Sequence, residues 1–365
     1  MKEFFRKQGV MPSWKTYFVT AMGAMAQGLF CTLLVGTILN TIGQQFHIGF
    51  LTKTLVTIKQ GAQTIDCTLG GLVSLTVGAG ISVAIGVSLK APPLVLFSLI
   101  PVGFAANALG GAGGPLAVYF VAIIACECGK LVSKTTKIDI LVTPIVTVLV
   151  GIGLSYLIAA PIGTAASAVG DAVKWATAQQ PFLMGILVSV IIGVALTLPI
   201  SSAAICAALG LTGLAGGAAV AGCCAQMVGF AVMSFRENRW GGLVAQGIGT
   251  SMLQMPNIVK NPRIWIPPTL VSAITGPLAT CLFKMEMNGT AVSAGMGTCG
   301  FVGQIGVYSG WVNDIANGTK AAITAMDWIG LVMICFVLPA VLTPLLGMLL
   351  RKLGWIKEGD LKLEL

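Results

Sequence analysis

The run "SSAAICAALGLTGLAGGAAVAGCCAQMVGFAVMSF", residues 201–235, decides the class of this protein. It holds no charged residue over 35 positions. One bilayer crossing needs about 20 apolar residues, so the run is too long to cross once. Two crossings within it would each be short and interrupted by glycine. Broken apolar helices of this kind are typical of membrane transport pathways.

The composition of the whole chain supports this interpretation. Charged residues make up 9% of the sequence and apolar residues 56%, and the mean hydropathy is +0.93. Soluble domains carry about a quarter charged residues, and the short alternating segments of a membrane barrel are missing from the sequence. We therefore expect an all-α polytopic membrane protein. Its candidate spans are 16–39, 68–89, 94–110, 115–132, 139–160, 182–200, 264–283 and 325–350.

The positions of the positive charges predict the topology. Lys and Arg cluster beside apolar runs, as they do in cytoplasmic loops, so both termini are expected in the cytoplasm. The N-terminal apolar run exceeds 20 residues and indicates a retained span rather than a cleaved signal peptide. The basic clusters are 2–15, 130–137, 236–239, 260–263 and 351–362.

The same positions of charge place both ends of two segments on one side of the membrane, and each segment is too short to cross and return as two full helices. Residues 241–262 have positive charge at both ends, and 289–312 must leave and return on one side. Both are predicted to be re-entrant, because irregular backbone at membrane depth needs protein or a water-filled cavity around it. We expect about eight to ten spans with one or two such hairpins in a single domain, 1–365. A similarity between 83–93 and 194–204 suggests internal repeats.

Residues 51–66, "LTKTLVTIKQGAQTID", are too polar to span. Their apolar residues recur at helical spacing, which predicts an amphipathic helix. Such a helix lies in the membrane interface or lines a protein cavity. Asp66 begins the next apolar run and can be drawn inward.

The sequence offers no support for a metal, cofactor or catalytic site. Most of the ten cysteines lie within apolar runs without a CxxC pair, and His47 is the single histidine, whereas a zinc site needs four suitably spaced ligands. No GxSxG, P-loop or HExxH motif occurs, and no charge-rich basic module suggests nucleic acid. We expect neither an enzyme nor a nucleic-acid-binding protein.

The stretch "GLVAQGIGTSMLQMPNIVKNPRIWIPP", residues 242–268, holds the main candidate site. On a continuous helix its polar residues fall within about 80° of one another. Exposing them to lipid is costly, so they face other helices or an aqueous cavity. They join neighbouring helices, or they bind a neutral, hydroxyl-rich solute. The five residues are Gln246, Thr250, Gln254, Asn257 and Asn261.

Other polar residues at membrane depth are weaker candidates, because each also suits a local backbone or interhelical hydrogen bond. The neutral ones are Ser201, Ser202, Asn107 and Gln304. The acidic ones, candidates for proton coupling or for accepting solute hydroxyls, are Glu127 and Asp66. Lys130 lies close to Glu127 in the sequence, so exposure of that pair at the interface is an equal alternative.

Several of these motifs resemble a known family. "LPISSAA" (198–204), the 241–268 block, Gly276-Pro277 and "LPAVLTPLLG" (338–347) are similar to the IIC subunits of bacterial phosphotransferase system sugar transporters. The nearest resemblance is to a divergent branch with toxin-regulator-like membrane proteins. It implies a homodimer in the bacterial inner membrane, with a scaffold part and a substrate-holding part built around re-entrant hairpins that moves like an elevator. It also places the polar residues of the block beside the substrate.

One feature departs from complete phosphotransferase systems. Only 15 residues follow position 350, so no IIA or IIB domain is expected and phosphorylation of a sugar needs a separate cytosolic IIB-type partner. The expected function is transport of a small neutral sugar or polyol. One alternative is transport of another solute, such as an organic anion, with Lys59, Lys90 or Arg236 as counter-charge. The other is a membrane sensor or regulator that binds a ligand without moving it.

Overall fold

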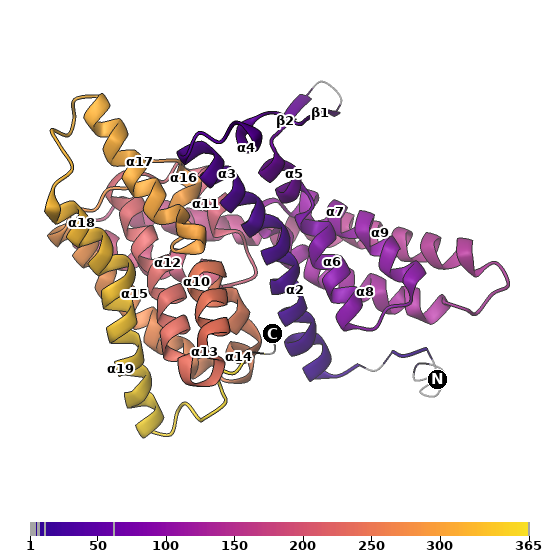
Figure 1. The fold of residues 1–365 in the computed structure, drawn as a ribbon. Helices are drawn as coiled ribbons and strands as arrows, with labels where there is room; N and C mark the ends of the chain where they lie inside the picture. Colours follow the sequence, from indigo (N-terminus) through magenta and orange to yellow (C-terminus); the bar gives the residue numbers. More distant parts are fainter. Residues whose placement is uncertain (1–4, 6–7, 11, 61–62, 364–365) are drawn as a thin grey trace. The chain divides into compact units, whose positions relative to one another are not determined.

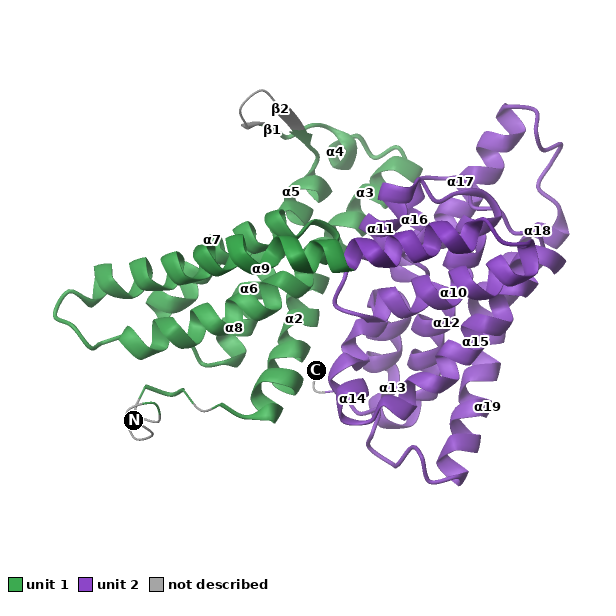
Figure 2. Cartoon of the chain, turned by 180° about the vertical axis from the view of Figure 1, so that it is seen from behind, with its two compact units in different colours: residues 1–165 green, residues 166–365 purple. Residues whose placement is uncertain are grey.

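The computed structural model describes residue 5 and residues 8–10, 12–60 and 63–363. The chain forms two compact units, Met1–Ala165 and Ala166–Leu365 (Figure 2). Helices make up almost all of the regular structure (Figure 1), and the described residues contain one two-stranded sheet. The prediction of an all-α membrane protein is confirmed.

Unit 1 begins with one continuous helical run, Lys15–Gln45, which is apolar enough to cross a bilayer. The run includes α2 (Met22–Leu29) and α3 (Val35–Gln45), each preceded by a π-helical stretch. A sharp bend of 50° separates α5 from α6. Proline stands at the first turn of α7 and α8, where its missing N–H costs nothing. The other elements are α4 (Gly49–Thr52), β1 (Val56–Gln60), β2 (Gln63–Cys67), α5 (Leu69–Leu75), α6 (Val77–Ser88), α7 (Pro93–Gly110), α8 (Gly114–Val132) and α9 (Asp139–Thr177).

Glycine lets the helices of unit 1 approach closely. A side chain at Gly78 in α6 would strike the carbonyl of Gly103 in α7, and one at Gly28 in α2 would strike Gly80. Ser82 also donates a hydrogen bond of 2.7 Å to the carbonyl of Leu99. Small residues at the crossings and a hydroxyl between helices are the usual means of packing where lipid supplies no hydrophobic drive.

The amphipathic helix predicted over 51–66 is wrong. Residues 56–60 and 63–67 pair as an antiparallel hairpin, with Val56 opposite Cys67 and Ile58 opposite Ile65. The segment is rich in β-branched Val, Ile and Thr, which favour strands, and over so short a window apolar spacing fits either period. Gly61 and Ala62 lie outside the described residues. Asp66 is exposed and accepts a 2.6 Å hydrogen bond from Thr57.

Unit 2 contains the end of α9 and ten further α-helices among its described residues. The 201–235 run forms a short helix, α11, and one full-length helix, α12, separated by the left-handed Gly210. The helices are α10 (Pro181–Thr197), α11 (Ser202–Leu209), α12 (Gly213–Met233), α13 (Phe235–Val244), α14 (Met255–Lys260), α15 (Ile266–Pro277), α16 (Ala291–Ala294), α17 (Val302–Ala316), α18 (Ala325–Val332) and α19 (Leu338–Lys352).

Helix α12 is the centre of unit 2. Its apolar window is 94% buried, and it contacts α10, α15 and α19. A side chain at Gly222 would strike the carbonyl of Ser189 in α10, and one at Gly217 would strike the carbonyl of Met285. Gly193 of α10 faces Gly222 in turn. Backbone-to-backbone packing therefore fixes α12 among its neighbours.

Among the described residues, six helices are long and apolar enough to cross a membrane, or seven if the bent α5–α6 pair is one span. The 40-residue run Pro93–Val132 contains both α7 and α8, which pack against each other, and α10 is 17 residues long. The predicted re-entrant runs hold only short or interrupted helices. Residues 241–262 include the end of α13, a π-helical turn, a 3₁₀ turn and α14, and 289–312 include α16, a 3₁₀ turn and most of α17. Their re-entrant course stays a prediction.

Candidate functional site

Three helix breaks of unit 2 lie against α12 and one another. The first, after α10, is capped by Ser201, whose hydroxyl accepts from the N–H of Ala204 at 3.2 Å. The second lies at the extended Thr250, between a π-helical and a 3₁₀ turn. The third runs through Gly297, Gly300 and Phe301, all with positive φ. The turns at the second and third breaks are in contact, so irregular backbone gathers in one region. We call this region the break centre.

The second and third breaks share a sequence signature that the analysis of the sequence missed. Residues 247–253 read "GIGTSML" and residues 295–301 read "GMGTCGF". Both contain Gly-X-Gly-Thr followed by a small residue, and the second glycine and the threonine stand at the break in each. Glycine supplies the backbone freedom that such a break needs. A search for internal repeats centred on glycine pairs would have found both copies.

Uncharged hydrogen-bonding groups fill the break centre. Thr197 and Ser251 share a hydroxyl–hydroxyl bond of 2.8 Å, and Ser202 donates to the carbonyl of Gly295 at 2.8 Å. Gln304 donates to the sulfur of Cys224 at 3.1 Å, whereas its buried oxygen has no partner among the described residues. A buried carbonyl oxygen without a donor is uncommon. That oxygen is free to accept a hydrogen bond from a ligand.

Gln226 of α12 extends this network. Its oxygen accepts from the indole N–H of Trp265 at 2.9 Å and from Thr197 at 3.4 Å. Its nitrogen donates to Thr269 at 3.3 Å. Gln226 is fully buried. Trp265 is thus fixed by an interhelical hydrogen bond.

The buried polar residues in the described part of unit 2 are all uncharged. A charged group in such an interior must be paired or neutralised. The pair Glu237–Arg351, at 2.6 Å, is partly buried and neutralises itself. The electrostatics of the break centre therefore suit a neutral ligand and not an ion.

The structure joins three of the five predicted amide-face residues by hydrogen bonds into one row. Asn257 donates to Gln254 at 2.8 Å, Gln254 donates to Gln246 at 2.8 Å, and Gln246 donates to Ser234 at 2.9 Å. Asn261 follows at the next turn and is half-buried. We call Gln246, Gln254, Asn257 and Asn261 the amide row. The fifth residue, Thr250, lies instead at the helix break and accepts from the N–H of Met252 at 3.2 Å.

Residues 354–363, which follow α19, occupy the amide row. Gln254 donates to the carbonyl of Leu361 at 3.0 Å, and Asn257 donates to that of Lys362 at 2.9 Å. Asn261 donates to the carbonyl of Trp355 at 3.0 Å and to the carboxylate of Asp360 at 2.7 Å. The sequence left two roles for these amides, hydrogen bonding between helices and ligand binding. Here their donors hold a peptide segment.

The remaining predicted residues lie in unit 1. Asn107 is half-buried in α7, beside Gly114 at the start of α8. Glu127 forms an ion pair of 3.1 Å with Lys130, whose ammonium also donates to the carbonyl of Leu89 at 3.1 Å. Lys130 is 3% exposed and Glu127 14%. An acid already paired with a buried cation is a weaker candidate for proton coupling.

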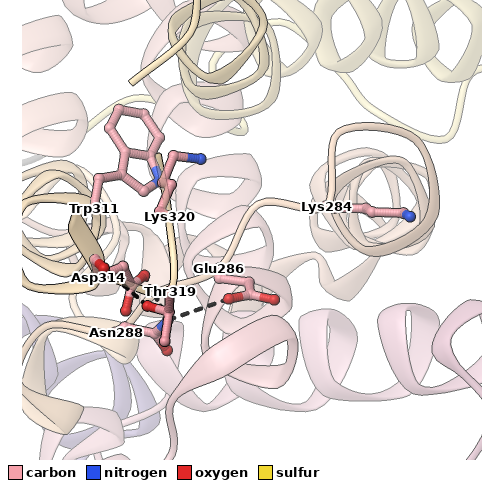
Figure 3. A pocket seen from close by; sticks show the side chains of 7 residues that line it. All are labelled: Lys284, Glu286, Asn288, Trp311, Asp314, Thr319 and Lys320. Atoms are coloured by element: carbon pink, nitrogen blue, oxygen red, sulfur yellow. Dashed lines mark hydrogen bonds between the residues drawn. The ribbon is translucent and has the colours of Figure 1, made fainter. Parts of the chain in front are cut away.

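Unit 2 also contains a charged pocket of about 380 Å³ (Figure 3). Asn288 donates to Asp314 at 2.9 Å and to Glu286 at 3.2 Å, so one amide bridges two carboxylates. Lys320 lies over the ring of Trp311 and pairs with Asp327 at 2.8 Å. The lining side chains are Lys284, Glu286, Asn288, Trp311, Asp314, Thr319 and Lys320. This mixture of charges differs from the uncharged break centre.

Comparison with known proteins identifies the family. Neither the curated proteins nor the solved structures contain a match to this chain. The sequence model of one family, described as "Phosphotransferase system, EIIC", matches residues 19–363, nearly the whole chain. Members of that family are the membrane subunits of sugar transport systems and act with a cytosolic IIB partner. With its broken apolar helices and uncharged polar centre, the chain belongs to the phosphotransferase system EIIC family.

Proposed function

We propose that this chain transports a small neutral, hydroxyl-rich solute, a sugar or polyol, and that the break centre of unit 2 binds it. The groups we assign to binding are Ser251, Gln304 and the backbone of the two Gly-X-Gly-Thr breaks. Amides and hydroxyls both donate and accept, as each hydroxyl of a polyol does. Backbone amides freed at helix breaks are common substrate contacts in transporters.

The uncharged interior of unit 2 carries this proposal. Its described buried polar residues include no acid and no base. An organic anion would enter without a counter-charge, at a large desolvation cost. Of the cations considered for an anion, Lys90 and Arg236 are exposed, and the side chain of Lys59 lies outside the described residues. A neutral solute avoids this cost, since hydrogen bonds alone replace its water.

We further propose that unit 2 carries the solute in an elevator movement while unit 1 serves as scaffold in a homodimer. The division of the chain into two compact units supports this, and so does the location of all three breaks of the centre within unit 2. The re-entrant course of 241–262 and 289–312 belongs to the same proposal. Light scattering of the purified protein measures its oligomeric state.

Solute counterflow in proteoliposomes tests the proposal, because exchange needs no phosphorylation and hence no IIB partner. We expect labelled neutral sugars or polyols to exchange and anionic analogues of the same size to be excluded. Ser251→Ala and Gln304→Ala each remove one hydrogen-bonding group. Each should raise the solute concentration at half-maximal exchange about tenfold, equivalent to about 1.4 kcal/mol of binding free energy. Gln179→Ala, on an exposed hydrogen bond after α9, is the matched amide control.

Two outcomes contradict this assignment. Exchange of the anionic analogues with exclusion of the neutral ones would favour the organic-anion alternative. Tight binding of a neutral ligand without exchange would favour the sensor or regulator alternative. If both variants keep the wild-type solute concentration at half-maximal exchange, the break centre is not the solute-binding site.

A further inference from the structure

The segment 354–363, which we call the strap, is held in an unusual way. Main-chain bonds join Gly354, Trp355 and Ile356 to the end of α19, and the other hydrogen bonds between described residues of the strap and the rest of unit 2 run through side-chain amides. Besides those from Gln254, Asn257 and Asn261, Asn238 donates to the carbonyl of Leu361 at 2.8 Å and accepts from the N–H of Leu363 at 2.8 Å. In the part of the chain that the structure describes, six bonds join the strap to four amide side chains. No ladder of main-chain bonds between residues 357–363 and the rest of unit 2 occurs among the described residues.

Two apolar side chains of the strap are buried, while Leu363 is half-buried and the exposed ring of Trp355 lies 5.4 Å from the guanidinium of Arg263. Leu361 is fully buried and Ile356 is 2% exposed. On one side the strap borders a cavity of about 700 Å³, which it lines together with Arg236, Glu237 and Arg351. A segment with few anchors and open space beside it has a low free energy of local opening. The strap can therefore leave without unfolding the helices below it.

Its departure would free a defined set of donors. Each side-chain amide has two N–H donors. Gln254 and Asn257 each give one donor to the strap and one to the row, whereas Asn261 gives both to the strap. Release of the strap thus exposes four N–H donors in sequence order. Peptide carbonyls and solute hydroxyls compete for the same donors, so both cannot occupy them together.

The row is connected with the break centre. Gln246 and Gln254 flank Thr250 and Ser251 in sequence, and Ser251 bonds to Thr197 at 2.8 Å. The row lies between the basic clusters 236–239 and 260–263, which the charge rule assigns to the cytoplasm. We propose that the strap is an autoinhibitory gate that covers the cytoplasmic end of the solute path and must leave the amide row for solute to pass. This proposal rests on the proposed function.

Hydrogen–deuterium exchange of peptides from 354–363 tests the hold without any solute. Asp360→Ala removes the bond to Asn261 and a 2.8 Å bond from the N–H of Lys357. We expect it to raise exchange of the strap about tenfold, equivalent to about 1.4 kcal/mol. Leu361→Ala should act in the same direction through the anchor. Glu358→Ala, exposed on the same segment, is the control and should leave exchange unchanged.

Counterflow then tests the gate. Asp360→Ala should raise the counterflow rate of the transported solute several-fold. Saturating solute should raise the hydrogen–deuterium exchange rate of the strap in the wild-type protein. Faster strap exchange with an unchanged or lower counterflow rate overturns the gate, as does protection of the strap by solute. If Asp360→Ala leaves hydrogen–deuterium exchange of the strap unaltered, the claim that these side-chain bonds hold the strap on the amide row is refuted. If wild-type protein moves no solute, the proposed function fails, while the strap measurement remains independent of it. Should Leu361→Ala not fold, Asp360→Ala decides alone.

Discussion

The hydrogen bond between Gln226 and Trp265 offers the sharpest energetic test of the structure. Gln226 lies fully buried in α12, and Trp265 stands just before α15. Their 2.9 Å bond is well formed, whereas the bonds of Gln226 to Thr269 and Thr197 are 3.3 and 3.4 Å long. Gln226→Met keeps the side chain's length and removes all three. It leaves the half-buried indole N–H without its acceptor.

The expected loss follows from these lengths. An orphaned buried donor costs about 1–3 kcal/mol, but bonds between helices in membranes average about 0.6 kcal/mol and reach about 1.7. We assign about 1 kcal/mol to the short bond with Trp265 and less than about 0.5 kcal/mol to each of the long ones. Gln226→Met should therefore lower the free energy of unfolding by about 1–2 kcal/mol.

A double-mutant cycle isolates the pair. Reversible unfolding in mixed micelles would be measured for Gln226→Met, for Trp265→Phe and for both together. We expect a coupling free energy of about 1 kcal/mol between Gln226 and Trp265. Each single variant already breaks their hydrogen bond, so the double variant loses that bond only once. The cycle of Gln226→Met with Thr269→Val, across the longer bond, should give less than half of that. A Gln226–Trp265 coupling within about 0.3 kcal/mol of zero would refute the reasoning.

Two further predictions concern close packing and the ion pair of unit 1. Gly222→Ala places a methyl group against the carbonyl of Ser189 and should destabilise the protein by about 1–3 kcal/mol, while Gly241→Ala, which meets nothing within 4 Å, should not. Equal thermal shifts for the two variants would contradict the α10–α12 packing. Lys130→Met should cost about 1–2 kcal/mol, discounted from the buried-pair range for partial exposure of Glu127, and Lys130→Met with Glu127→Gln should recover most of it with counterflow intact. Loss of counterflow in a stable double variant would instead assign a coupling role to Glu127.

Composition was enough to predict the membrane class, because the cost of exposing apolar helices does not depend on how they pack. Charge bookkeeping also singled out 241–262 and 289–312, where the structure has only short or interrupted helices. The 51–66 segment failed because a few apolar residues fit both the helical and the strand period. Its β-branched residues were the better signal, since strand propensity depends on residue shape.

The amide row was predicted from a continuous helix that does not exist. Residues 243–261 pass through a π-helical turn, an extended threonine and a 3₁₀ turn, yet Gln246, Gln254 and Asn257 still bond to one another. Buried amides need hydrogen-bond partners whatever the local backbone, so these side chains meet even without a continuous helix. Their peptide partner lies 107 positions away from Gln254. No local pattern could predict a contact of that separation, because only the tertiary fold brings the strap to the row.

The two kinds of polar site in unit 2 have different physical requirements. The break centre includes an acceptor without a partner, the oxygen of Gln304, so it gains hydrogen bonds when a ligand enters. The amide row has every side-chain N–H occupied, so a ligand there only exchanges one acceptor for another and gains little free energy per bond. A neutral solute therefore binds first at the centre. It displaces the strap only if the anchors Leu361 and Ile356 release at comparable cost, which is why weakening the strap should change the rate of exchange more than the affinity for the solute.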